Sequence, residues 1–143
     1  MNGDSETGCT TFLIEKEIDT GNVLQQAKFP ISTNATTGEV HDEMKEVGAR
    51  LLLDTCCKLF DQSIQGKPQS DFEAKQMRPA PKLHKENCKI DWSLPCLQIH
   101  NFIRGLNPFP TAWTETSEMT YKIHFGNPTD ISSNDVPGAL IQN

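Results

Sequence analysis

Apolar and polar positions follow strand-like patterns at both ends of the chain and a helix-like pattern between them. Near the start, residues 9–14 and 23–31 are β-rich runs without a helical period. The polar segment between them, residues 15–22, ends in Gly-Asn. Two strands around a short polar segment predict a hairpin. Its tip can present the carboxylate of Asp19 to a cleft, because binding residues often lie on loops that a rigid scaffold holds.

The pattern becomes helical after Thr36. Thr36 and Glu39 fit a capping box, in which each side chain bonds the other residue's backbone N–H at a helix start. We expect Gly48 to bend or break the helix, and the helical region to end by Gly66 and Pro68. Two apolar stripes, both expected to face the core, follow at helical spacing: Val40, Met44, Val47 and Leu51, and then Leu52, Cys56, Leu59 and Phe60.

A segment without any period, residues 67–90, separates the long helix from a shorter one. Its Pro-Ala-Pro at residues 79–81 favours extended backbone, so this segment is expected to be a linker. The shorter helix should begin with Ser93 as its N-cap, hold Pro95 in its first turn and end at Gly105. Three of its side chains are expected to face inward: Leu97, Phe102 and Ile103.

After a rigid N-P-F-P loop at residues 107–110, the apolar period becomes two. Residues 112–115 and 119–125 are expected to be the strands of a second hairpin with a turn at 116–118. Residues 139–141 should begin a third strand. Three short strands rarely enclose a core of their own, so we expect the C-terminal part to be an incomplete fold.

Size and composition are those of an ordinary globular protein. The chain has 143 residues, of which 36% are hydrophobic and 22% charged, enough for one domain or two small ones. No apolar run approaches the roughly 18–20 residues that span a bilayer. The first residues are polar and acidic, unlike a secretory signal or a mitochondrial presequence. The cytoplasm is therefore the expected location, and no membrane contact is expected.

The five cysteines predict free thiols rather than a disulfide framework or a metal centre. Their number is odd, two of them are adjacent at residues 56–57, and no C-x-x-C occurs. Cys96 and His100 lie four residues apart on the expected short helix, but a second ligand pair at metal-binding spacing is missing. We therefore expect no metal site, and cysteines that act as small buried apolar side chains.

The net charge of −6 hides a basic stretch in the middle of an acidic chain. Residues 1–66 carry 5 basic and 11 acidic groups, residues 67–90 carry 6 and 3, and residues 91–143 carry 2 and 5. A basic stretch is consistent with a polyanionic partner such as nucleic acid. It is also consistent with a solvated linker, and charge alone favours the linker.

Two stretches of sequence resemble known enzymes, and the first one surrounds Asp19. E-T-G-C-T at residues 6–10 is followed, after eight residues, by D-T-G at residues 19–21. This spacing resembles the signature of enzymes that use 10-formyltetrahydrofolate, in which an E-T-G-x-T strand leads to a D-T-G loop with a catalytic Asp. Purine-ribonucleotide, methionyl-tRNA and sugar-nucleotide formyltransferases share the signature, so it does not choose among them.

The second stretch is more selective. K-L-H-K-E-N-C-K-I-D-W-S at residues 82–93 resembles the linker and domain entry of methionyl-tRNA formyltransferases. I-R-G-L-N-P-F-P-T-A-W-T at residues 103–114 resembles the opening of their C-terminal domain. Purine-pathway formyltransferases lack this domain. The N-P-F-P loop fits the tRNA enzyme better than the related formyltetrahydrofolate dehydrogenases and sugar-nucleotide enzymes.

The resemblance implies an α/β fold that begins with the C-terminal part of a Rossmann-like formyltransferase domain and continues into an incomplete OB-like β-barrel. The implied divisions are the end of the folate-binding domain in residues 1–66, a basic linker in residues 67–90, and the start of a tRNA-binding domain in residues 91–143. The chain is expected to be an internal piece of a longer enzyme.

The resemblance also implies roles for particular residues. Asp19 matches the catalytic Asp of the family. Lys82 and Lys85 match the basic linker that lies along the initiator methionyl-tRNA. The loop that lines the pterin pocket of the formyl donor, 10-formyltetrahydrofolate, is matched by the backbone of Lys16, Glu17 and Ile18.

In this family the α-amine of methionyl-tRNA attacks the formyl carbon. An Asn and a His stabilise the tetrahedral oxyanion and assist proton transfer, and the Asp holds and charges the His. The Asn and the His lie upstream in the family, near an S-L-L-P motif that does not occur in this sequence. None of the four histidines of this chain sits in the family context. We therefore expect little activity from this chain by itself.

Two other interpretations stay open. One is a non-catalytic, tRNA-binding remnant of the enzyme, which the basic character of residues 67–90 favours. The other is a related formyltetrahydrofolate hydrolase or sugar-nucleotide formyltransferase. The parent enzyme is expected to be monomeric, whereas this chain by itself is expected to aggregate, exchange strands or dimerise through exposed strand edges.

Overall fold

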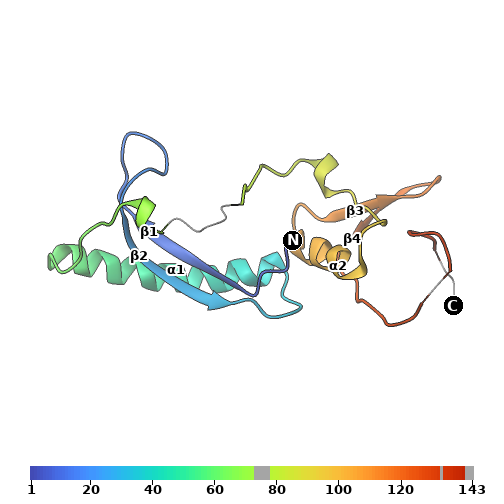
Figure 1. Cartoon of the computed structure of the whole chain (residues 1–143), viewed down its shortest axis with the longest axis horizontal. Helices are drawn as coiled ribbons and strands as arrows, with labels where there is room; N and C mark the ends of the chain where they lie inside the picture. Colours follow the sequence, from blue (N-terminus) through green and yellow to red (C-terminus); the bar gives the residue numbers. More distant parts are fainter. Residues whose placement is uncertain (73–77, 133, 141–143) are drawn as a thin grey trace. The chain divides into compact units, whose positions relative to one another are not determined.

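The computed structural model describes residues 1–72, 78–132 and 134–140. They form two compact units. The hairpin unit comprises residues 5–32 and 40–81, and the C-terminal unit comprises residues 1–4, 33–39 and 82–143. Figure 1 follows the chain through both units.

The hairpin unit contains two antiparallel strands, β1 (Glu6–Phe12) and β2 (Val23–Pro30), as the strand patterns predict. The register pairs Glu6 with Pro30 at one end and Phe12 with Val23 at the other, and it shifts between Thr11 and Phe12. A Cβ atom on Gly8 would lie 2.4 Å from the carbonyl oxygen of Ala27 on the partner strand. The glycine of the E-T-G-C-T motif therefore lets the two backbones approach closely.

A single helix, α1 (Thr37–Phe60), follows the hairpin. The predicted capping box is confirmed: the Thr36 N–H donates to Glu39 Oε2 at 2.8 Å, and the Glu39 N–H donates to Thr36 Oγ1 at 3.3 Å. The expected bend or break at Gly48 is wrong, because the helix continues through it. A mid-helix glycine costs only about 1 kcal/mol relative to alanine, and a Cβ atom at this position would make an ordinary contact with Cys9 Sγ at 3.5 Å.

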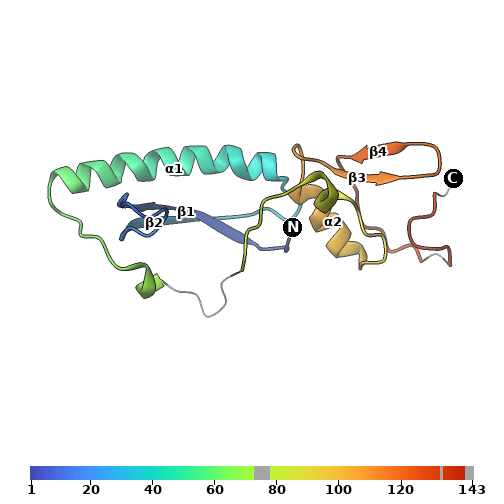
Figure 2. The same ribbon diagram turned by 90° about the horizontal axis from the view of Figure 1, so that it is seen from above.

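The hairpin packs along one face of α1 (Figure 2). Thr55 is 2% exposed, and its hydroxyl lies 3.0 Å from Thr11 Oγ1 and 2.7 Å from Gln25 Oε1. Leu51 is buried on the same face. The second apolar stripe was expected in the core, and this prediction is wrong. A two-stranded sheet covers only one face of a helix, so these side chains are exposed: Leu52 at 56%, Leu59 at 41% and Phe60 at 89%.

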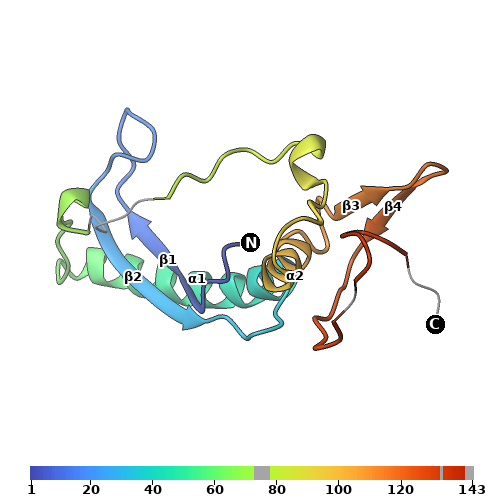
Figure 3. The same cartoon turned by 45° about the vertical axis from the view of Figure 1, so that its right-hand side comes forward.

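The C-terminal unit contains the short helix α2 (Cys96–Gly105) and an antiparallel hairpin of β3 (Ala112–Glu115) and β4 (Thr120–Ile123) (Figure 3). A 3-10 turn, η2 (Lys85–Cys88), leads into this unit. Lys89 forms a parallel bridge with Trp113, next to the β3–β4 pair. The buried core of this unit consists of Cys88, Ile90, Ile103, Leu106 and Ala112.

Three details of the C-terminal unit differ from the sequence-based expectations. Pro95, not Ser93, is the N-cap of α2, because the Ser93 hydroxyl and N–H both donate to Asp91 Oδ1 instead. These bonds lower the pKa of the Asp91 carboxyl. Leu97 is 63% exposed rather than inward-facing. Residues 139–140 are not in a strand, and residue 141 lies outside the described residues.

The sheets in the described part of the chain are two-stranded, and no closed barrel is seen there. The described residues combine helices with β-strands, so the fold is α/β. Within the same residues, no helix is long and apolar enough to cross a membrane. All five cysteines are free, but only Cys88 is buried, whereas Cys56, Cys57 and Cys96 are exposed. The expectation that the cysteines serve as buried apolar side chains therefore fails for these three.

Candidate active-site loop and basic segment

The loop that carries Asp19, residues 13–22, begins where the strand ladder ends. The backbone N–H of Leu13 donates to the Asn22 carbonyl at 2.9 Å and closes the loop at its base. In Figure 1 the loop projects from the end of the β1–β2 hairpin. The four residues predicted for the site are exposed and adjacent on it: Lys16, Glu17, Ile18 and Asp19. We call residues 13–22 the Asp19 loop.

The D-T-G motif has a defined backbone conformation. Asp19 has a φ of 57°, in the left-handed region that Asp tolerates better than most residues. The Thr20 hydroxyl donates to the Glu17 carbonyl at 3.0 Å. A Cβ atom on Gly21 would lie 1.6 Å from the Leu13 carbonyl oxygen, so no other residue fits there. The motif therefore specifies a tight closure that leaves the Asp19 side chain in solvent.

A second segment of the hairpin unit lies against the base of this loop. It includes the 3-10 turn η1 (Gln69–Phe72). Lys67 and Val23 exchange two backbone hydrogen bonds of 2.8 Å. Gln69 Nε2 donates to the carbonyl oxygens of Asp19 at 2.6 Å and Gly21 at 2.8 Å. Sequence reasoning missed Gln69, because its bonds span 48 to 50 residues and no local pattern signals them.

Two apolar side chains of the loop point away from the protein. Ile14 is 94% exposed and Ile18 is 89% exposed. Isolated exposed apolar residues are common on protein surfaces. Here, however, both belong to the short loop that carries Asp19, so they add apolar surface beside its carboxylate. A loop with this composition can contact a ligand that is partly aromatic and partly charged.

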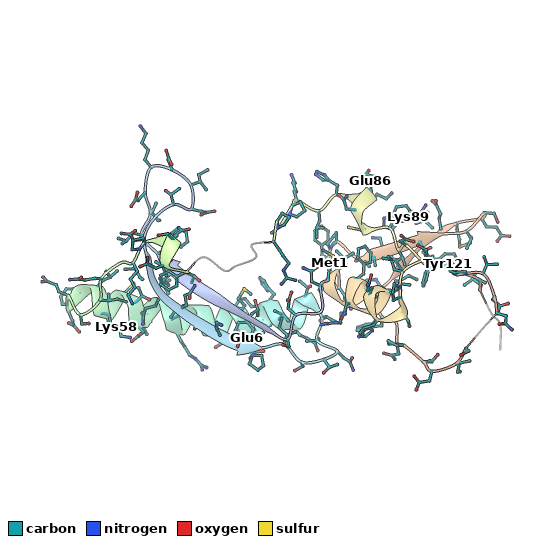
Figure 4. The ribbon with its side chains drawn as sticks, in the orientation of Figure 1. Met1, Glu6, Lys58, Glu86, Lys89 and Tyr121 are labelled. Carbon is teal, nitrogen blue, oxygen red and sulfur yellow. The ribbon has the colours of Figure 1, made fainter. Side chains whose placement is uncertain are left out.

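In the C-terminal unit, the two predicted nucleic-acid contacts lie in residues 82–89, which we call the basic segment and which are exposed except for Cys88. Lys82 is exposed ahead of η2, and Lys85 is the first residue of η2. The Lys85 ammonium lies 5.7 Å from the centroid of the Trp113 ring. The Lys89 ammonium lies 5.3 Å from the same ring and pairs with the Glu115 carboxylate. Figure 4 shows Lys89 beside the β3–β4 hairpin.

Backbone contacts and one buried thiol fix the end of the basic segment to the core. The indole N–H of Trp113 donates to the Lys85 carbonyl at 2.7 Å. Cys88 is 1% exposed, its thiol donates to the His84 carbonyl at 3.2 Å, and burial raises the pKa of the thiol. Lys89 was not among the predicted contacts. Lys89 lies four residues after Lys85, and only a prediction of the turn η2 between them would have placed both lysines together.

The described residues of the C-terminal unit line at least two hollows. The larger, about 520 Å³, has apolar walls from α2, β4 and the segment near residue 136, including Trp92, Ile99, Ile123 and Phe125. The smaller, about 180 Å³, includes Glu39, His100 and Arg104. Arg104 donates to the Ala35 carbonyl at 2.9 Å, and His100 Nδ1 lies 2.7 Å from the Gly126 carbonyl. Neither hollow includes a predicted site residue.

The described residues contain no group of three or more His, Cys, Asp or Glu side chains placed to hold a metal ion. His41 lies 3.7 Å from the neighbouring Asp42 carboxylate, and His84 precedes η2. The Asn107 amide donates to the His124 carbonyl at 2.9 Å. None of these interactions involves the Asp19 loop.

Comparison with known proteins identifies the class. Residues 1–56 match the family described as formyl transferase, and residues 82–143 match the formyl transferase C-terminal domain. The chain therefore belongs to the formyltransferase family and includes parts of both of its domains. Within this family, the methionyl-tRNA formyltransferase of Bacteroides fragilis is 44% identical over 116 residues, which make up 80% of this chain and 36% of the relative.

The chain thus spans about a third of the length of the curated relatives that it matches. Solved structures agree on the fold. HypX from Aquifex aeolicus in complex with tetrahydrofolic acid matches with a TM-score of 0.63 at 20% identity, over 79% of this chain and 19% of that one. Methionyl-tRNA formyltransferase from Clostridium thermocellum matches with a TM-score of 0.57 at 15% identity, over 82% of this chain and 49% of that one.

Proposed function

We propose that this chain supplies part of the formyl-transfer site and part of the tRNA-binding surface of a methionyl-tRNA formyltransferase. The reaction transfers the formyl group of 10-formyltetrahydrofolate to the α-amine of initiator methionyl-tRNA, for translation initiation. The observation that carries the proposal is the D-T-G loop, whose backbone is fastened while its carboxylate stays exposed. The 44% identity to a methionyl-tRNA formyltransferase supports the choice of acceptor.

The proposed role of Asp19 follows from the chemistry of acyl transfer. The attacking amine must lose a proton, the leaving N10 of the folate must gain one, and the oxyanion must receive hydrogen bonds. A carboxylate can orient a proton-transfer group and stabilise its charged form. Asp19 is assigned that supporting role. Its partners, an Asn and a His in the family, are assigned to parts of the relatives that this chain does not match.

The formyl donor is proposed to lie against the Asp19 loop. Lys16, Glu17 and Ile18 are exposed residues, and their backbone can offer hydrogen-bonding groups to a pterin ring. The exposed side chains of Ile14 and Ile18 offer apolar surface for the flat ring system. Donor and loop are thus matched in chemistry, with polar ring edges for the backbone and ring faces for the isoleucines.

The basic segment is proposed to bind the phosphate backbone of tRNA through Lys82 and Lys85. Lys89 lies close enough to the same Trp113 ring to act with Lys85. An ammonium group near an aromatic face is attracted electrostatically to the ring, which partly orients it. Phosphate contacts of this type position a nucleic acid and make its binding depend on salt.

The division into residues 1–66, 67–90 and 91–143 is proposed as the end of the folate domain, the linker and the start of a tRNA-binding domain. We propose that the last part belongs to an OB-like barrel. The β3–β4 pair and the parallel bridge between Lys89 and Trp113 support this assignment, because they place three short strand segments side by side. OB folds commonly bind nucleic acid on a strand face.

Formyl transfer by the full-length protein tests the proposal. Replacing Asp19 by Asn should lower kcat by roughly 10³-fold, the middle of the range for a group that assists proton transfer. Asp61→Asn, which changes an exposed carboxylate of the same unit, is the control and should keep activity within about twofold. Full activity of the Asp19→Asn enzyme would overturn the assignment of Asp19.

The acceptor is tested separately. The full-length protein should formylate methionyl-tRNA in preference to water or an amino-sugar nucleotide. Transfer to water or to the sugar nucleotide alone would indicate the related hydrolase or sugar enzyme. Salt-sensitive tRNA binding without formyl transfer to any acceptor would instead indicate a tRNA-binding remnant.

The parent enzyme is proposed to be a monomer, and this chain by itself is proposed to associate. Each described sheet has two strands and therefore open edges, which are ready templates for pairing with a second chain. The exposed stripe of α1 adds apolar surface. Sedimentation of the 143-residue chain should show dimers or larger species, and a monodisperse monomer would contradict this.

A further inference from the structure

Gln69 joins two carbonyl groups of the D-T-G motif from a distant part of the sequence. Its amide nitrogen lies 2.6 Å from the Asp19 oxygen and 2.8 Å from the Gly21 oxygen. These carbonyls stand on either side of Thr20. A side-chain amide nitrogen carries two hydrogens, so each carbonyl can receive its own. We propose that Gln69 is a positioning residue for formyl transfer, which holds the D-T-G backbone so that the Asp19 carboxylate keeps one direction.

The backbone conformation of the loop explains why these two Gln69 hydrogen bonds, which we call the clamp, are needed. Asp19 occupies the left-handed region, with a φ of 57°. Residues with a side chain keep such a conformation when the surrounding structure holds it. The Asp19 side chain itself is exposed, so neighbouring side chains do not pack around it. The direction of its carboxylate therefore depends on the backbone beneath it, and Gln69 bonds that backbone directly.

Gln69 is itself anchored to the hairpin. Two residues earlier, Lys67 and Val23 exchange backbone bonds of 2.8 Å in both directions. Val23 starts β2 directly after the Asp19 loop and is 5% exposed. The segment with Gln69 is thus fastened to the strand that the loop enters. The clamp is thus attached at one end to the buried residue Val23, and at its other end it bonds the exposed loop.

This inference rests on the proposed function, because it assumes that Asp19 assists the reaction. Displacement of a reacting group by about 1 Å can cost on the order of 100-fold in rate. In the full-length protein, Gln69→Met removes both donated hydrogens and keeps the length and bulk of the side chain. We expect kcat to fall by roughly 10- to 100-fold, while the KM for methionyl-tRNA stays within about twofold.

Two further variants separate a clamp from a general structural role. Gln69→Lys restores donors at similar reach, and we expect it to recover most of the lost kcat. Gln26→Met is the matched control, since Gln26 donates to Thr10 Oγ1 at 3.2 Å on the same hairpin, away from the loop. It should leave kcat unchanged. A kcat of Gln69→Met within twofold of the wild type, or equal losses in the Met and Lys variants, would overturn the proposal.

Amide hydrogen exchange of residues 16–22 tests whether Gln69 holds the loop, and this measurement does not require formyl transfer. Exchange should be faster in Gln69→Met than in the wild type and in Gln26→Met. If the wild-type protein transfers no formyl group to any acceptor, the proposed function fails. Hydrogen exchange alone then shows whether Gln69 holds the loop. Unchanged exchange in Gln69→Met would refute the clamp whether or not the protein is an enzyme.

Discussion

The Asp19 loop and the basic segment both present charge to solvent, but they are held in different ways. In the loop, hydrogen bonds fix the main chain: Leu13 to Asn22 at the base, and Gln69 to the D-T-G carbonyls. In the basic segment, the aromatic ring of Trp113 and the buried thiol of Cys88 support long, exposed lysine side chains.

The difference corresponds to the two tasks proposed for these regions. A carboxylate that assists proton transfer must keep its place to within a fraction of an ångström. An ammonium that contacts a phosphate acts over a longer range and tolerates several positions. Changes to the loop should therefore alter kcat, whereas changes to the basic segment should alter tRNA affinity and its dependence on salt.

The largest effect is expected from Gly21→Ala. The new Cβ would lie 1.6 Å from the Leu13 carbonyl oxygen, so the loop cannot close as it does now. We expect formyl transfer to fall by more than about 100-fold, and the free energy of unfolding to fall by about 3 kcal/mol. Activity assays and denaturant titration measure both. Unaltered tRNA affinity would support separate roles for the two regions, whereas a parallel loss of tRNA affinity would contradict them.

Leu106→Ala tests the support of the basic segment. Leu106 is fully buried in the same core as Cys88, so the cavity should cost about 3 kcal/mol of unfolding free energy. Leu97→Ala is the control on the same unit, because Leu97 is 63% exposed and should cost less than about 1 kcal/mol. If both variants lost the same unfolding free energy in a thermal or denaturant melt, Leu106 would not be a core residue as described.

Lysine substitutions sharpen the contrast through salt dependence. Lys85→Ala and Lys89→Ala should each weaken tRNA binding about threefold and reduce the slope of log K against log salt by roughly 0.9. Glu115→Gln should strengthen binding, because it frees Lys89 from its ion pair. Lys45→Ala, on α1, serves as the control. In all these variants, kcat at saturating tRNA should stay constant. If the Lys85 and Lys89 variants leave the slope unchanged, these two residues do not contact the tRNA.

The smallest effect concerns the start of α1, outside both regions. Bonds from the Thr36 N–H and hydroxyl lower the pKa of Glu39. The folded pKa is thus below the unfolded value, so this stabilisation is present above the unfolded pKa and is lost as the pH falls through the folded one. Thr36→Ala should cost about 1 kcal/mol at neutral pH. Melting temperatures of the wild type and Glu39→Gln should converge as the pH falls below the ordinary carboxyl pKa and through the lowered pKa of Glu39. A constant gap would contradict the assignment.

Sequence patterns predicted most of the local structure. Both hairpins, the capping box at Thr36 and the end of α2 at Gly105 are confirmed. Each depends on residues within a few positions of one another, or on a period that one segment carries by itself. The expectations for Gly48 and Ser93 failed because packing and a competing carboxylate outweighed the local preference.

The sequence by itself determined the family, the position of Asp19 on an exposed loop and the basic character of residues 67–90. These features lie in motifs and charges that are contiguous along the chain. Only the tertiary structure decided that Gln69 fastens the D-T-G carbonyls, that Lys89 joins Lys85 at Trp113, and that one stripe of α1 stays exposed. The physical reason is that these contacts join residues far apart in sequence, so they exist only once the chain has folded.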